Sequence, residues 1–123
     1  MATILIVDDE GPVRDFLAQF LADVGHRTLQ AIHGAQALEL VEMEQPDLVI
    51  ADIMMPVLNG AELCRQLKTR VDMPAIAVIL MSAAGRRSAD GTGADAFISK
   101  PFDLEDMHAL VNRHTRARPE RVS

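Results

Sequence analysis

The chain has 123 residues, of which 49% are hydrophobic and 24% are charged, as in one ordinary globular domain. Its formal net charge of −6 argues against a nucleic-acid-binding domain, because binding to phosphates requires clustered lysine and arginine. The single cysteine excludes an internal disulfide and fits a reducing cytosol, and no apolar stretch approaches the roughly 20 residues that span a membrane. We therefore expect a cytoplasmic protein with no membrane segment and no direct binding of nucleic acid.

The first half of the chain alternates strand patterns with helix patterns. The continuous β-branched and leucine run at residues 3–7 predicts a buried parallel strand. A helix follows, with Pro12 in its first turn and Gly25 as its stop. Its apolar residues at helical spacing are Val13, Phe16, Leu17, Phe20, Leu21 and Val24. Residues 26–31 alternate and predict a weaker strand near a sheet edge, and a second helix is expected over residues 34–44.

The second half continues the alternation. Residues 47–52 read as a buried strand that ends in Asp52, and a third helix is expected from Gly60, with Cys64 as a buried thiol on its apolar face. A break at residues 72–74 precedes an apolar strand over 75–81, which ends at Ser82. The remaining expected elements are a short strand at 96–99, which ends at Lys100, and a last helix with Asp103 as a plausible N-cap.

This alternation predicts an α/β fold: a (βα)5, doubly wound, flavodoxin-like domain with a five-stranded parallel sheet in the order 2-1-3-4-5. In that order the first and third strands are neighbours, so their carboxyl ends bring Asp8, Asp9 and Asp52 together. Ser82 and Lys100 emerge at the same edge of the sheet, from the fourth and fifth strands.

Three carboxylates at one point repel one another, at a cost of roughly 4 kcal/mol for a pair about 4 Å apart at an effective dielectric constant near 20. Mg²⁺ would offset this repulsion, Lys100 supplies a fixed positive charge, and Ser82 supplies a hydroxyl donor. Such a set suits phosphoryl transfer to a carboxylate, with Asp52 as the nucleophile. Taken singly, these residues are ordinary solvated acids, a surface lysine and a loop cap. Their coincidence at the ends of four strands of one sheet favours a functional site.

Four motifs carry a family resemblance that covers nearly the whole chain. They are residues 4–10, residues 46–56 with Asn59-Gly60, residues 81–83, and residues 93–97 leading to 100–102. With them the chain resembles the response-regulator receiver domain of two-component signalling, and it is similar to the single-domain chemotaxis regulator.

The resemblance implies the roles of particular residues. It implies Asp52 as the phosphoacceptor, Asp9 as a direct Mg²⁺ ligand, Asp8 acting mainly through a metal-bound water, and the Met54 carbonyl as the last protein ligand. It further implies Ser82 as the switch hydroxyl, Phe97 as the switch aromatic residue, and a cis peptide bond between Lys100 and Pro101 that helps to aim the lysine.

The chain departs from the family between Ser82 and Lys100, where a full fourth helix usually lies. Residues 83–95 are shorter than the family norm by roughly one helical turn, contain three glycines and have almost no apolar face. We expect a vestigial, distorted or disordered fourth helix; a deletion that merely shortens a loop is the alternative. A further hypothesis is that residues 85–93 are mobile and become ordered by phosphate or a partner. The loss of this face makes the family's usual dimer less favourable, so we expect a monomer.

The sequence thus predicts a receiver domain at residues 1–117 and a short basic tail at 118–123. Its expected function is a phosphorylation-dependent switch that takes a phosphoryl group from a histidine kinase or phosphotransfer protein and acts on a downstream partner, or on an output domain from which the chain was excised. It is not expected to be an enzyme with a separate substrate. The alternative is a pseudo-receiver that works as an interaction module without phosphorylation. A phosphatase with an aspartyl nucleophile is disfavoured, because Met54 stands where such enzymes place a second acid.

Overall fold

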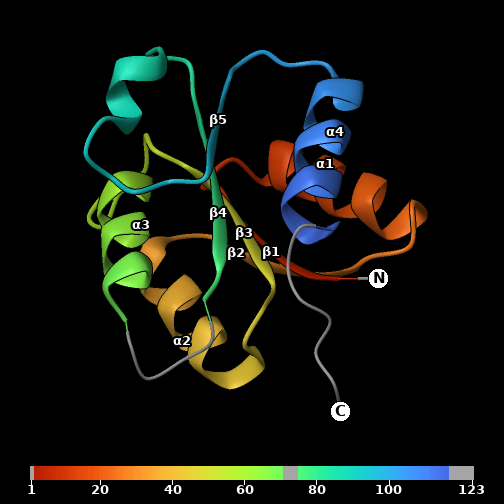
Figure 1. The fold of residues 1–123 in the computed structure, drawn as a ribbon, viewed down its shortest axis with the longest axis horizontal. Coiled ribbons are helices and arrows are strands. Elements are labelled where there is room, and N and C mark those ends of the chain that lie inside the picture. The colour runs from red at the N-terminus through yellow and green to blue at the C-terminus, as the bar shows by residue number, and fades with distance from the viewer. Residues whose placement is uncertain (1, 71–74, 117–123) are drawn as a thin grey trace.

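The computed structural model describes residues 2–70 and 75–116. Its five parallel strands form one sheet in the order β2-β1-β3-β4-β5 (Figure 1). The strands are β1 (Thr3–Val7), β2 (Arg27–Ala31), β3 (Leu48–Asp52), β4 (Ala77–Ser82) and β5 (Ala96–Ser99). The helical elements are α1 (Gly11–Asp23), α2 (Gly34–Glu44), α3 (Gly60–Thr69), the 3₁₀ turn η1 (Arg86–Ala89) and α4 (Leu104–Arg116). The predicted fold class and strand order are confirmed, whereas the predicted break at 72–74 and the tail at 118–123 lie outside the described residues.

Helical layers cover both faces of the sheet. Helices α2 and α3 lie on one face, and α1 and α4 on the other (Figure 1). All five residues of β3 are buried, and they alternate between the two cores, so that Val49 faces α2 and α3 while Ile50 faces α1 and α4. A strand buried on both faces must be apolar throughout, which is why this run of the sequence lacks a polar alternation. Burial of each large aliphatic side chain contributes roughly 1.5–3 kcal/mol to folding.

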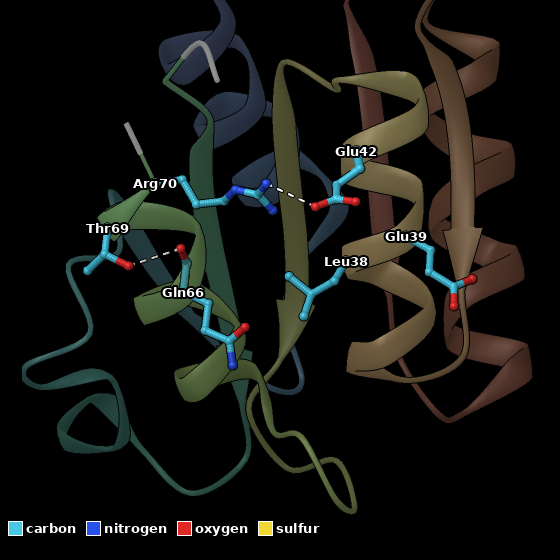
Figure 2. A pocket seen from close by; sticks show the side chains of 6 residues that line it. All are labelled: Leu38, Glu39, Glu42, Gln66, Thr69 and Arg70. Carbon is cyan, nitrogen blue, oxygen red and sulfur yellow. Dashed lines mark hydrogen bonds and ion pairs between the residues drawn. The ribbon is translucent and has the colours of Figure 1, made fainter. Parts of the chain in front are cut away.

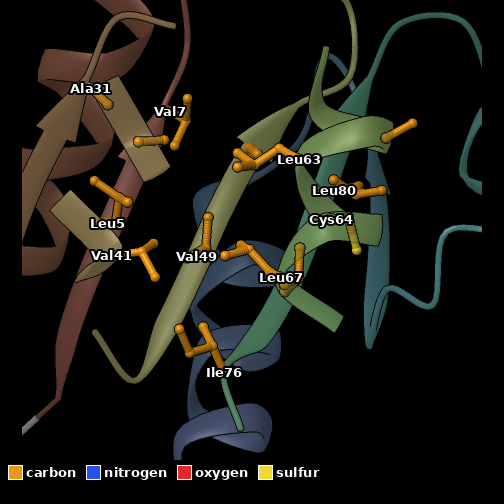
Figure 3. Packing of buried hydrophobic residues seen from close by; sticks show 14 of the residues in the cluster. Leu5, Val7, Ala31, Val41, Val49, Leu63, Cys64, Leu67, Ile76 and Leu80 are labelled. Atoms are coloured by element: carbon orange, nitrogen blue, oxygen red, sulfur yellow. The ribbon is translucent and has the colours of Figure 1, made fainter. Parts of the chain in front are cut away.

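The core under α2 and α3 is aliphatic (Figure 3). Val41 from α2 and Leu63 and Leu67 from α3 pack against Leu5 and Val49 of the sheet. Cys64 is fully buried in the same layer, as its position on an apolar helix face predicted, and burial raises the pKa of its thiol. On the opposite face, two residues of the predicted apolar spacing are not covered: Phe16 of α1 is 60% exposed, and Val24, the C-cap of α1, is 40% exposed.

Local signals in the sequence fix where the helices begin and end. His33 and Asn59 are the N-caps of α2 and α3, and their side chains accept hydrogen bonds from the backbone N–H groups of Gln36 and Glu62, at 3.1 and 2.9 Å. After α1 the chain turns at Gly25, whose φ of 103° is one that only glycine adopts without strain. No helix in the described residues is both long enough and apolar enough to cross a lipid bilayer.

The connection between β4 and β5 contains no full helix. Its helical content is the four-residue turn η1, and Gly85 and Gly91, on either side of η1, both have positive φ, which no helix accommodates. The expectation of a vestigial fourth helix is therefore confirmed. The connection is tied to its surroundings by Asp95, whose carboxylate accepts hydrogen bonds from Lys68 Nζ of α3 at 2.5 Å and from the Val78 N–H at 2.7 Å.

Mobility of residues 85–93 remains a prediction. The hydrogen bonds within this segment are short-range ones. The N–H groups of Ser88, Asp90 and Thr92 donate to the carbonyls of Gly85, Arg87 and Ala89, and the Ser88 and Thr92 hydroxyls donate to the Gly85 and Ala89 carbonyls. Amide hydrogen exchange tests this hypothesis, and strong protection across Arg86–Asp90 in unmodified protein would rule it out.

Candidate functional site

Asp52 ends the central strand β3 and lies at the carboxyl edge of the sheet. It is 4% exposed, and both of its carboxylate oxygens are hydrogen-bonded. Oδ1 accepts from the backbone N–H of Met54 at 3.0 Å, and Oδ2 accepts from Lys100 Nζ at 3.0 Å. The carboxylate is therefore held in one orientation by its own loop and by a residue far along the chain.

Asp8 directly follows β1, the neighbour of β3, and it is fully buried. Its Oδ1 accepts from the Glu10 N–H at 2.8 Å and its Oδ2 from Lys100 Nζ at 2.9 Å. Its own N–H donates to the Ala31 carbonyl of β2 at 3.2 Å, and its carbonyl accepts from Arg14 Nη1 at 2.7 Å. Both the backbone and the side chain of Asp8 are thus fixed.

Lys100 joins the two buried aspartates. It follows β5, where its N–H donates to the Ser82 carbonyl at 3.0 Å, and the peptide bond to Pro101 is cis, as the resemblance implied. Burial alone lowers the pKa of this lysine, but the hydrogen bonds to Asp8 and Asp52 and their negative charges outweigh burial and raise the pKa above its ordinary value. The ammonium group therefore stays charged at neutral pH and compensates one of the two carboxylates.

Glu10 is the third acid that reaches this point. Within residues 2–70 and 75–116, carboxylate oxygens of Asp8, Glu10 and Asp52 lie within 4.8 Å of one another, and Glu10 Oε1 is 3.6 Å from Lys100 Nζ. Asp9, for which the family resemblance implied direct metal binding, is exposed and is not among these three. Converging carboxylate oxygens are the donors that a hard cation such as Mg²⁺ prefers, so the residues present fit such an ion.

The other predicted site residues lie on β4, on β5 and in the loop after β3. Ser82, the last residue of β4, is fully buried, and its hydroxyl oxygen accepts from the Ala84 N–H at 2.9 Å. Phe97 pairs with Leu80 in the register of β4 and β5 and is partly buried against the core. Met54 is 61% exposed at the start of the loop that follows Asp52.

That loop depends on a glycine at position 60. A Cβ on Gly60 would lie 2.4 Å from the backbone oxygen of Asp52, far inside van der Waals contact. The Gly60 N–H also donates to the Ile53 carbonyl at 3.2 Å, which folds the start of α3 back onto the end of β3. The Asn59-Gly60 pair is therefore both the start of α3 and part of the frame around Asp52.

A separate hollow of about 440 Å³ lies between α2 and α3 (Figure 2). Its lining residues are Leu38, Glu39, Glu42, Gln66, Thr69 and Arg70. Arg70 Nη2 pairs with Glu42 Oε1 across it at 2.9 Å. Asp8, Glu10, Asp52 and Lys100 form the acidic site. None of these four residues lines the hollow, so the two are distinct.

The family model for the response regulator receiver domain matches residues 4–112. The chain belongs to the response regulator receiver domain family. Its similar relatives include the response regulator MprA of Mycolicibacterium vanbaalenii, at 40% identity over 91% of this chain and 51% of that protein, and MprA of Mycobacterium leprae, at 39% identity over 88% and 48%. The chain thus spans about half the length of the curated relatives it matches.

Solved receiver domains have the same architecture. The signal receiver domain of a signal transduction histidine kinase from Syntrophus aciditrophicus matches with a TM-score of 0.90 and 31% identity, over 100% of this chain and 98% of that one. The receiver domain of NtrX from Brucella abortus matches with a TM-score of 0.84 and 32% identity, over 94% and 99%. The family assignment made from the sequence motifs is confirmed.

Two residues at the site of this receiver domain were not predicted. Glu10 entered the sequence analysis only as the last residue of the motif at residues 4–10. Its signal was its position two residues after Asp8, because the turn there lets the Glu10 N–H donate to the Asp8 carboxylate. Arg14 was not singled out, because one arginine on an amphipathic helix is ordinarily a solvated residue.

Proposed function

We propose that this receiver domain is a phosphorylation-dependent switch in which Asp52 accepts a phosphoryl group from the phosphohistidine of a histidine kinase or phosphotransfer protein. The observation that carries the proposal is the bridge that one partly buried ammonium group, Lys100 Nζ, makes between Asp52 and Asp8. A cation at this position offsets the repulsion between the two acids and remains beside Asp52 for an incoming phosphoryl group.

The reaction requires one bond exchange. A carboxylate oxygen of Asp52 attacks the phosphorus, a P–O bond forms, the P–N bond to the donor imidazole breaks, and that nitrogen keeps the bonding electron pair and takes a proton from water. Lys100 stabilises negative charge on the transferring group, and the Met54 N–H holds one oxygen of the nucleophile in place. Hydrolysis of the acyl phosphate later returns the carboxylate, so the domain acts on itself and has no separate substrate.

Mg²⁺ is the cofactor of this proposal. Asp8, Asp9, Asp52 and the Met54 carbonyl would hold it, and the convergence of the Glu10 carboxylate adds a fifth candidate. When bound, the ion supplies positive charge that neutralises phosphoryl oxygens. Asp8 and Lys100 keep the acidic site assembled without it, because each is fixed by hydrogen bonds to the protein.

Ser82 and Phe97 are the proposed switch residues. The Ser82 hydroxyl oxygen is engaged with the Ala84 N–H, at the start of the connection that contains η1. A turn of this hydroxyl towards a phosphate on Asp52 would release Ala84 and alter the connection, and Phe97 on the neighbouring strand would follow. The proposed partners are a phosphodonor protein and a downstream protein or output domain, and the proposed state is a cytoplasmic monomer.

The alternative function is that of a pseudo-receiver, which binds partners without being phosphorylated. It is supported by the reduced connection between β4 and β5, the segment through which a switch would be read out. The full set of Asp8, Asp52, Ser82 and Lys100 at one edge of the sheet favours the phosphorylated switch instead.

Incubation with acetyl phosphate and Mg²⁺, followed by intact mass spectrometry, separates the two functions. The switch predicts a phosphoryl adduct on the wild type that is absent with Asp52→Asn and absent without Mg²⁺. Glu39→Gln, at an exposed acid that lines the separate hollow, is the matched control and should keep the adduct. No adduct on the wild type would favour the pseudo-receiver.

A further inference from the structure

Arg14 lies on α1, but its side chain reaches the acidic turn, which consists of residues 8–10 after β1. Its backbone N–H makes the first hydrogen bond of the helix, to the Glu10 carbonyl at 3.1 Å. Its side chain turns back along the same helical turn, so that a Cβ on Gly11 would lie 3.7 Å from Nη2. Side chains of a helix lean towards its N-terminus, and here this lean brings the guanidinium group to the loop that carries the acids.

The guanidinium group makes two hydrogen bonds in two directions. Nη1 donates to the main-chain carbonyl of Asp8 at 2.7 Å, and Nε donates to Gln30 Oε1 of β2 at 3.0 Å. The planar fork of arginine suits this arrangement, because two of its donors lie at a fixed angle to each other. Arg14 therefore ties α1, β2 and the acidic turn together at the edge of the sheet that bears Asp52.

The carbonyl that Arg14 holds belongs to the peptide bond between Asp8 and Asp9. A peptide unit is planar, so a fixed carbonyl direction also fixes the direction of the N–H of Asp9 and limits where its side chain can point. The Asp8 N–H is held independently by the Ala31 carbonyl of β2. That bond belongs to the preceding peptide unit, so among the described contacts it is Arg14 that holds the Asp8–Asp9 peptide itself.

We propose that Arg14 is a positioning residue for metal binding, which sets the Asp8–Asp9 peptide so that the two acids are presented to a divalent cation beside Asp52. The inference rests on the proposed function, because it takes Mg²⁺ as the ligand of this site. Arg14 acts through Asp8 and Asp9 and not on the phosphoryl group. Its loss should therefore weaken cation binding and leave the reaction at saturating Mg²⁺ little changed.

The test is a titration of ¹⁵N-labelled protein with Mg²⁺, followed by the amide resonances of Asp9 and Glu10. Arg14→Gln should raise the apparent Kd about tenfold, as is common when a residue that orients a metal ligand is lost. Arg14→Lys keeps the charge but loses the fork, so it should give a smaller rise of about threefold. The matched control Arg65→Gln removes an exposed arginine that pairs with Glu62 on α3, and it should leave the Kd unchanged.

Two further measurements separate positioning from general damage to the fold. Gln30→Ala removes only the second anchor of the guanidinium group and should raise the Kd in the same direction as Arg14→Gln, by about twofold. The rate of adduct formation from acetyl phosphate should fall for Arg14→Gln at low Mg²⁺ and recover at saturating Mg²⁺.

An Arg14→Gln protein that folds and binds Mg²⁺ like the wild type would overturn the inference and leave the proposed function standing. Full rescue by Arg14→Lys would also overturn the role given to the planar guanidinium group, because an ammonium donor would then suffice. A wild-type titration without any shift at Asp9 or Glu10 would overturn the proposed function together with this inference.

Discussion

Lys100 Nζ lies 3.0 Å from Asp52 Oδ2, and 48 positions of sequence separate the two residues. The contact exists because β3 and β5 flank β4 in one parallel sheet, so that both chains leave it at the same edge. The Lys100 side chain is 16% exposed, and its ammonium group is the cation that Asp8 and Asp52 share. It therefore serves both the stability of the fold and the proposed chemistry.

Replacement of Lys100 by methionine should lower the free energy of unfolding by about 3 kcal/mol in the absence of Mg²⁺. Removal of one partner leaves two buried carboxylates without a counter-charge, which costs more than loss of a surface pair. Lys68→Met, which breaks the more exposed pair with Asp95, should cost only about 1 kcal/mol. Urea unfolding with and without Mg²⁺ is the measurement, and Mg²⁺ should restore part of the stability of the Lys100 variant only. Equal losses for both lysines would contradict the proposed role of Lys100.

Substitution of Gly60 by alanine should destabilise the domain by about 2 kcal/mol or more, because the new methyl group meets the backbone at Asp52 and cannot rotate away. The same change should slow formation of the acyl phosphate, since the end of β3 must shift. Gly11→Ala is the matched control, because its Cβ would have only an ordinary contact at 3.7 Å, and it should be neutral or slightly stabilising. Thermal unfolding and adduct rates of the two variants give the comparison, and similar behaviour would show that the contact is not tight.

Val57, in the loop between β3 and α3, has a φ of 67° and a fully exposed side chain. A β-branched residue is strained in the left-handed region, and here no packing compensates for the strain. Val57→Asn should therefore stabilise the domain by about 1 kcal/mol, because asparagine tolerates this conformation. Val24→Gly, at a partly exposed valine with a φ of −91°, should instead destabilise it. Chemical denaturation decides the matter, and a Val57→Asn protein less stable than the wild type would show that the loop conformation is different.

Much of the fold could be predicted because its causes are local. Continuous apolar runs predicted the buried strands, and a third helix was expected from Gly60. The structure explains that start by an N-cap at Asn59 and a close backbone approach at Gly60, each of which demands a particular residue type. The reduced connection after β4 was predictable for the same reason, since positive φ at Gly85 and Gly91 is incompatible with a helix.

The parts that could not be predicted depend on contacts between distant segments. The spacing in α1 did not distinguish buried Leu17 from exposed Phe16, because both fit an apolar helical stripe and only tertiary packing decides which part of the stripe is covered. The convergence of Glu10 on the site depends on the path of a turn, and the reach of Arg14 depends on a partner in another strand. Sequence patterns report which residues are available at an edge of a sheet, whereas side-chain geometry decides which of them meet.

His26 should make the domain less stable as the pH drops below about 6.5, the ordinary pKa of histidine. His26 Nδ1 accepts a hydrogen bond from the Ala2 N–H at 3.1 Å, which only the neutral ring can do at that atom. Burial lowers the pKa of His26 in the folded state, and the nearby charge of His108 acts in the same direction. Between the folded pKa and the ordinary value the unfolded chain binds more protons, so acid favours unfolding over that window.

His26→Asn removes the titration but keeps an acceptor for the Ala2 N–H, so the difference in unfolding free energy between pH 7.5 and pH 5.5 should be smaller in the variant than in the wild type. Urea unfolding at the two pH values measures this. An unchanged difference would mean that His26 does not contribute to the acid sensitivity.

The most direct test of the central claim is to locate the phosphoryl group itself. Borohydride reduces an acyl phosphate to an alcohol and converts the modified aspartate to homoserine, which peptide mass spectrometry can place. After reaction with acetyl phosphate and Mg²⁺, homoserine should be found at position 52 and nowhere else among the acids of the site. Homoserine at position 8 or 9, or a phosphoryl adduct that borohydride leaves unchanged, would contradict the assignment of Asp52 as the phosphoacceptor.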